Sequence, residues 1–73
     1  MNTKAIMIRN KDRIVFWECD GKYYVIIEQW KKKHWVEESC AEVSKELGNK
    51  FYKLFLKEGF KKCSKEYCAR YVR

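Results

Sequence analysis

The dipeptide Asp20-Gly21 constrains the fold most, because it separates two runs rich in β-branched and aromatic residues, 13–19 and 22–30. Asp-Gly is a strong signal for a two-residue β-hairpin, since both central residues of such a turn need positive φ. A turn here also sets the register of the two strands. The predicted pairs are Glu18 with Tyr23, Trp17 with Tyr24, Phe16 with Val25, Val15 with Ile26, Ile14 with Ile27 and Arg13 with Glu28.

Both faces of this hairpin are apolar. The alternating sets are Ile14, Phe16, Tyr23, Val25 and Ile27 on one face, and Val15, Trp17, Tyr24, Ile26 and Trp30 on the other. A sheet with one face in water would alternate apolar and polar residues instead. We therefore expect the second face to be covered by a later segment, by a second copy of the chain or by a ligand.

Two further strands are predicted beside the hairpin. Residues 4–9 are apolar in their middle and are followed by turn residues 10–12, and another strand is expected to begin at Trp35. The interpretation is a three- or four-stranded antiparallel sheet, a β-meander.

A helix over about residues 40–58 is predicted next. Ser39 and Glu42 form a capping-box pattern before the apolar period Val43, Leu47, Phe51, Leu54 and Phe55. Gly59-Phe60 is typical of a Schellman ending. Two shorter helices joined at Gly48 are the alternative. Ser64 is predicted to cap a last short helix, with a strand as the weaker alternative, so the fold class is α+β with one long and one short C-terminal helix.

The length and amino-acid composition indicate one small folded domain over residues 1–73. The chain is 47% hydrophobic, has no proline, and carries no apolar run of membrane-spanning length. With no signal peptide visible, a cytoplasmic protein with no membrane partner is expected. The four cysteines, Cys19, Cys40, Cys63 and Cys68, are expected to be reduced.

The net charge of +7 is concentrated in the last third of the chain, where residues 50–73 hold eight bases and two acids. A one-sided positive field favours nucleic acid or an acidic protein as partner. Lys50, Lys53, Lys57 and Lys61 recur at spacings of three and four, which places them on one face of the predicted helix. The alternative to a binding surface is that these lysines simply form the solvated outer face of an amphipathic helix.

The segment 29–36, QWKKKHWV, places Lys31, Lys32, Lys33 and His34 between Trp30 and Trp35. Lysines beside an exposed Trp35 could hold phosphates while the indole stacks on a base. The alternative, which we weight more, is a four-residue turn from Lys31 to His34 with the two indoles facing each other. The two interpretations are compatible.

Metal binding and catalysis are weaker hypotheses. His34, Cys40, Cys63 and Cys68 could supply four zinc ligands, although their spacing is not that of the common zinc fingers. A Cys40 thiol in the first helical turn would be activated by the helix dipole, but a single histidine without an orienting acid does not make a triad. We expect no cofactor and no enzymatic activity.

The order of three strands and a helix with a basic surface resembles small DNA-binding domains that lay a three-stranded sheet in the major groove. It is also similar to double-stranded RNA-binding domains without their first helix. The chain departs from the former pattern at residues 35–39, which lack the glycine found after the last strand there. The resemblance concerns architecture and does not imply a function.

Two functions follow as hypotheses. The first is a small, non-enzymatic nucleic-acid-binding accessory or regulatory protein, with contacts from Lys31, Lys32, Lys33, Lys50, Lys53, Lys57, Lys61 and Trp35. The second is a protein-interaction module, such as a small phage-type inhibitor, antitoxin or anti-defence factor, or a homodimer. Its interface would be Trp17, Tyr24, Ile26 and Trp30, since tryptophan and tyrosine are common interface hot spots. We rank the first ahead.

Overall fold

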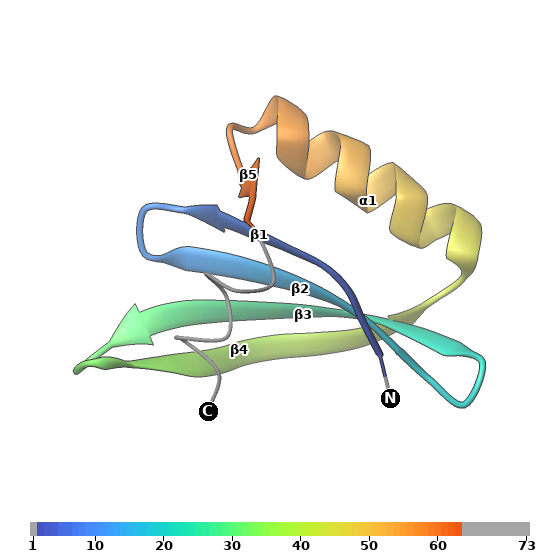
Figure 1. Cartoon of the computed structure of the whole chain (residues 1–73), viewed down its shortest axis with the longest axis horizontal. Coiled ribbons are helices and arrows are strands. Elements are labelled where there is room, and N and C mark those ends of the chain that lie inside the picture. Colours follow the sequence, from blue (N-terminus) through green and yellow to red (C-terminus); the bar gives the residue numbers. More distant parts are fainter. Residues whose placement is uncertain (1, 64–73) are drawn as a thin grey trace.

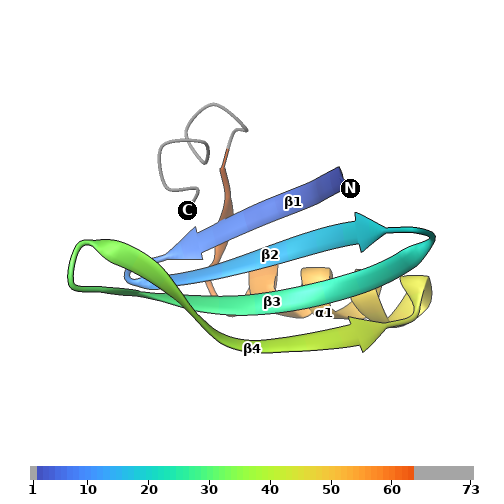
Figure 2. The same cartoon turned by 90° about the horizontal axis from the view of Figure 1, so that it is seen from below.

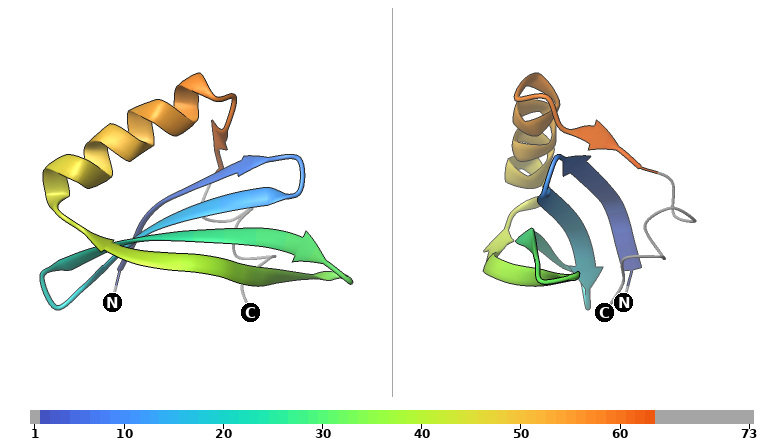
Figure 3. Two further views of the ribbon diagram at one scale, coloured as in Figure 1. Left: turned by 180° about the vertical axis from the view of Figure 1, so that it is seen from behind. Right: turned by 90° about the vertical axis from the view of Figure 1, so that its left-hand side faces the viewer.

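A computed structural model describes residues 2–63, which form a five-stranded antiparallel sheet with one helix across one face (Figure 1). The elements in chain order are β1 (Asn2–Arg9), β2 (Asp12–Cys19), β3 (Lys22–Lys31), β4 (His34–Val43), α1 (Lys45–Lys57) and β5 (Lys61–Lys62). The sheet has the right-handed twist usual for antiparallel strands (Figure 3).

The strand order is β4-β3-β2-β1-β5. The first four strands form the expected meander, and the chain then crosses one face as α1 and returns to pair β5 with β1. The α+β class is therefore confirmed. The sheet has one strand more than predicted, because Gly59 and Phe60 turn the chain back onto the free edge of β1. The predicted short helix after Ser64 lies outside the described residues.

The β2–β3 hairpin has the predicted register in all six pairs, from Glu18 with Tyr23 to Arg13 with Glu28. Asp20 and Gly21 form its turn with φ of 53° and 77°, both positive as the two-residue turn requires. Local turn chemistry and apolar alternation act together here, so the register follows from a short segment of sequence.

The helix starts later than predicted. Residues 39–43 pair with β3, Ser39 opposite Ile27 and Val43 opposite Tyr23, and remain extended. The pairing of a whole strand outweighs the local capping-box signal at Ser39. Ser44 caps α1 instead, and its Oγ accepts a hydrogen bond from the backbone N–H of Leu47 at 3.1 Å.

The end of α1 is the predicted Schellman motif. The N–H of Phe60 donates to the carbonyl of Phe55 at 3.0 Å, the N–H of Gly59 donates to the carbonyl of Leu56 at 3.2 Å, and Gly59 has a φ of 98°. The rings of Phe55 and Phe60 pack edge to face, 5.3 Å between centroids. Gly48 does not divide the helix.

The core lies between α1 and the first face of the sheet. Its buried residues are Met7, Ile14, Phe16, Val25 and Phe60, against which the half-buried rings of Phe51, Tyr52 and Phe55 pack. No residue of α1 itself is fully buried, and Leu47, Leu54 and Leu56 are 42%, 47% and 46% exposed. The helix therefore covers the sheet mainly through its aromatic side chains.

Candidate functional site

The segment between Trp30 and Trp35 is a tight turn at the end of the sheet. Trp30 pairs with Trp35 and Lys31 pairs with His34, which leaves a two-residue turn rather than the predicted four. The two indoles face each other as expected, edge to face with centroids 5.4 Å apart. Lys32 and Lys33 make the turn with φ of 48° and 71°.

Two lysines in the left-handed region are unfavourable. The left-handed conformation costs about 1–2 kcal/mol for most residues, with glycine and, to a lesser degree, Asn and Asp as the exceptions, and turns of this kind favour Asn-Gly. The two adjacent positive charges also repel each other. Backbone strain of this kind is concentrated at functional sites, so this turn is a candidate contact point.

The turn lysines differ in their ion pairing. Lys31 forms an ion pair with Glu38 at 2.7 Å, whereas Lys32 and Lys33 are exposed and make no ion pair within residues 2–63. The N–H of Trp30 donates to the carbonyl of Lys11 at 2.8 Å, which places the β1–β2 turn beside this one. We call Lys11, Lys32 and Lys33 the basic turn. Sequence reasoning missed Lys11, although alternate turns of a meander share one end of the sheet.

Lys50, Lys53 and Lys57 form a second basic surface, which we call the helix ridge. All three are exposed, and they lie on the side of α1 opposite the core-facing rings of Phe51 and Phe55. Because the core-facing rings point to the sheet, the ridge on the other side of the helix faces away from it. Figure 1 shows α1 across one face of the sheet and the β3–β4 turn at its end, so the two surfaces are separate.

Lys61 does not belong to the helix ridge, contrary to the prediction. The helix ends at Lys57, and Lys61 lies in β5 opposite Ile8. Because paired residues point to the same face of a sheet, Lys61 belongs to the second face and its neighbour Lys62, opposite Met7, to the first.

Three of the nine acidic residues within 2–63 lie together on the edge strand opposite β5. Glu37, Glu38 and Glu42 are exposed on the edge strand β4. These three acids lie at the opposite edge of the sheet from the lysines of β5, whereas Glu46 lies in the first turn of α1 and Glu58 at its C-terminal end. An uneven distribution of charge can orient a charged partner as well as attract it.

Trp35 is not the exposed stacking ring that was predicted. Its side chain is 6% exposed, and the guanidinium carbon of Arg13 lies 4.6 Å from the centre of its ring. The strand pairing with β3 places the indole on the second face, among residues of that face. A nucleic-acid base cannot reach it in this arrangement.

The second face carries a buried ion pair. Nε of Arg13 lies 2.6 Å from Oε1 of Glu28, and the two residues are 3% and 1% exposed. Burial lowers the pKa of Arg13 from its ordinary value. The sequence predicted this pairing but not its burial.

The predicted interface residues, Trp17, Tyr24, Ile26 and Trp30, share the second face, which Figure 2 shows with α1 behind the strands. Trp17 and Tyr24 are in ring contact, 6.2 Å between centroids. Ile26 is only 8% exposed, while Trp17, Tyr24 and Trp30 are half-buried. The aromatic rings are therefore the accessible part of this set.

The proposed zinc ligands are not brought together. His34 and Cys40 lie on β4, and Cys63 follows β5 at the opposite edge of the sheet. Within residues 2–63 no three histidine, cysteine or acidic side chains form a group that could hold a metal ion, and Cys68 lies outside the described residues. Cys63 is disulfide-bonded, which corrects the expectation of four reduced cysteines.

Cys40 is not an activated thiol. It lies within β4 and not at the start of a helix, and its side chain is exposed. Desolvation and then the negative charge of Glu37 raise the pKa of its thiol. Both effects disfavour the thiolate, which is the nucleophilic form.

No helix among residues 2–63 is long and apolar enough to cross a membrane. Comparison of the chain with protein-family models, with characterised proteins and with solved structures found no match.

Proposed function

We propose that this chain is a small, non-enzymatic nucleic-acid-binding protein that contacts the phosphate backbone of RNA or DNA through the helix ridge and the basic turn. One observation carries the proposal. The lysines of these two surfaces are exposed and make no ion pair within residues 2–63.

The physical basis is the release of counterions. Each lysine that neutralises a phosphate frees a condensed counterion, which adds affinity that falls as salt rises. Residues three and four apart on a helix have Cβ atoms about 5–6 Å apart, so the ridge presents a continuous row of charge. The strained basic turn adds a second point of contact that a backbone can meet independently of base sequence.

The test measures affinity for labelled single-stranded and duplex RNA and DNA by fluorescence anisotropy, from about 50 to about 200 mM salt. If all six lysines of the helix ridge and the basic turn contact duplex phosphates, the logarithm of affinity should fall against the logarithm of salt with a slope of about −5.4, at about 0.9 per contact. The variant K50Q/K53Q/K57Q should reduce the magnitude of the slope by about 2.7 on the same basis.

A matched control is Lys22→Gln, because Lys22 is an exposed lysine at the opposite end of the sheet, beside the Asp20-Gly21 turn. Its removal should leave the slope nearly unchanged. The proposal is wrong if no nucleic acid binds at the lowest salt, or if the ridge variant and the Lys22 variant lose the same affinity per charge removed.

A protein partner is the second candidate function. The half-buried rings of Trp17, Tyr24 and Trp30 on the second face favour it, since such rings are frequent hot spots. A second copy of the chain is the simplest partner. Sedimentation equilibrium tests the dimer, and a W17A/Y24A variant that remains as associated as the unmodified chain would exclude this face as the interface.

A further inference from the structure

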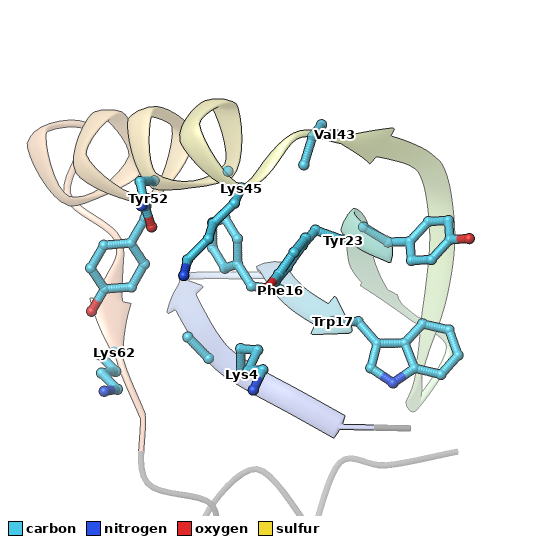
Figure 4. A pocket seen from close by; sticks show the side chains of 12 residues that line it. Lys4, Phe16, Trp17, Tyr23, Val43, Lys45, Tyr52 and Lys62 are labelled. Atoms are coloured by element: carbon cyan, nitrogen blue, oxygen red, sulfur yellow. The ribbon is translucent and has the colours of Figure 1, made fainter. Parts of the chain in front are cut away.

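A pocket of about 430 Å³ lies between the first half of α1 and the first face of the sheet (Figure 4). It is distinct from the helix ridge, which points away from the sheet. Aromatic side chains and lysines from several elements line it, among them Phe16, Tyr23, Tyr52, Lys4, Lys45 and Lys62. Trp17 and Tyr24, which alternate onto the second face, also contribute to its lining. Its volume falls within the range of small-molecule sites.

Aromatic rings form the walls of the pocket. Phe16 is 8% exposed and belongs to the core, and the half-buried ring of Tyr52 packs edge to face on it at 5.6 Å between centroids. Because the core holds Phe16 in place, Tyr52 is supported in a defined orientation. A planar ring that enters the pocket would therefore meet a preformed aromatic surface.

Three lysines surround these rings, Lys45 from the start of α1, Lys62 from β5 and Lys4 from β1 (Figure 4). Lys4 forms an ion pair with Glu18 at 2.8 Å. Lys45 and Lys62 are exposed and make no ion pair within residues 2–63. The pocket thus presents two ammonium groups that an anion could contact, and the charge of Lys45 also acts on the carboxylate of Glu18.

The helix carries its one glycine where it borders the pocket. Gly48 and Asn49 both line it, and glycine is the poorest helix former after proline. Neither backbone nor packing requires glycine at position 48, because its φ is not positive and a Cβ there would lie 3.6 Å from Cγ2 of Val43, an ordinary contact. Its small size does keep this wall of the pocket open.

We infer that the pocket binds one nucleotide unit, with the base on the aromatic wall of Tyr52 and the phosphate held by Lys45 and Lys62. This inference rests on the proposed nucleic-acid function and deepens it. The helix ridge would then supply sequence-independent affinity, and the pocket would recognise a single nucleotide, either free or at the end of a strand.

The test follows amide shifts of the ¹⁵N-labelled full chain during titration with adenosine 5′-monophosphate, ribose 5-phosphate and adenosine. The nucleotide should bind at least about tenfold more tightly than either fragment, since only it combines stacking with a phosphate contact. Shifts should centre on Lys45, Tyr52 and Lys62. Absence of shifts, or equal shifts with ribose 5-phosphate, would overturn the inference.

Two variants at position 48 separate binding from folding. Gly48→Leu should fill the pocket and abolish nucleotide binding, while Gly48→Ala should keep the fold and most of the affinity. A Gly48→Leu chain that is folded and binds as before would refute the site. Oligonucleotides with and without a 5′-phosphate then show whether the pocket takes a strand end.

The same variants distinguish the two proposals. K50Q/K53Q/K57Q should lose salt-dependent affinity for oligonucleotides and still bind the mononucleotide, while Gly48→Leu should do the reverse. Both proposals are supported if the ridge variant loses salt-dependent affinity for oligonucleotides and keeps mononucleotide binding. Nucleic-acid binding without mononucleotide binding would refute the pocket and leave the basic surfaces in place.

Discussion

Replacing Lys32 and Lys33 by Asn and Gly should stabilise the protein and weaken its binding to nucleic acid. Both lysines have left-handed φ values, 48° and 71°. Relief of two left-handed residues is worth about 2 kcal/mol at the lower end of the usual range. Glycine's greater freedom in the unfolded chain offsets roughly half of this gain. The net change is an increase of about 1 kcal/mol in the free energy of unfolding, or about 4–8 °C in Tm for a domain of this size.

The binding effect has the opposite sign. Loss of two phosphate contacts should reduce the magnitude of the salt slope on duplex nucleic acid by about 1.8. Thermal unfolding followed by circular dichroism and fluorescence anisotropy measure the two effects on the same sample. The control K32Q/K33Q removes the charges but keeps side chains at both left-handed positions, so it should lose the affinity without most of the gain in Tm.

Two results would refute this reasoning. An unchanged or lower Tm in K32N/K33G would show that the turn is not strained in the way the φ values indicate. Unchanged affinity in both variants would show that the basic turn does not contact nucleic acid, whatever the helix ridge does.

Three further predictions concern stability. Arg13→Met or Glu28→Leu alone should lower the free energy of unfolding by about 3–5 kcal/mol, because the charge of the remaining partner stays buried without its counter-charge. In urea titrations the double variant should lose less stability than the sum of the two single losses. The hydrogen bond from Lys4 holds the pKa of Glu18 below its usual 4.5; the stability this adds is present above that pH and is lost as pH falls through the lowered pKa. Urea titrations at several pH values should therefore show a flatter acid limb for Glu18→Gln. Ser44→Ala should cost about 1 kcal/mol in thermal unfolding, because the N–H of Leu47 loses its acceptor.

The functional surfaces were predictable to different degrees. The spacing of Lys50, Lys53 and Lys57 was sufficient for the helix ridge, because a helix converts spacing directly into position on one face. The pocket could not be predicted, since Lys4, Tyr52 and Lys62 are far apart in the chain and meet only through the sheet order. The burial of Trp35 depends on its contact with Arg13 on the second face, which the sequence does not reveal. Trp35 was therefore predicted to be accessible.

The sequence alone determined the β2–β3 hairpin, its register and the apolar character of both its faces. Asp20 and Gly21 have the required turn conformation intrinsically, and strand alternation needs only neighbouring residues. The Schellman ending at Gly59 is local in the same way. These features follow from interactions between residues close together in the chain.

Tertiary structure decided where β4 ends, where Lys61 points and how deeply Arg13 and Glu28 are buried. At Ser39 a local capping signal competes with pairing to β3, and the ladder of hydrogen bonds along β3 outweighs a single cap. β5 forms because α1 returns the chain to the free edge of β1. Such outcomes depend on the free energy of the whole sheet, which the sequence of a short segment does not determine.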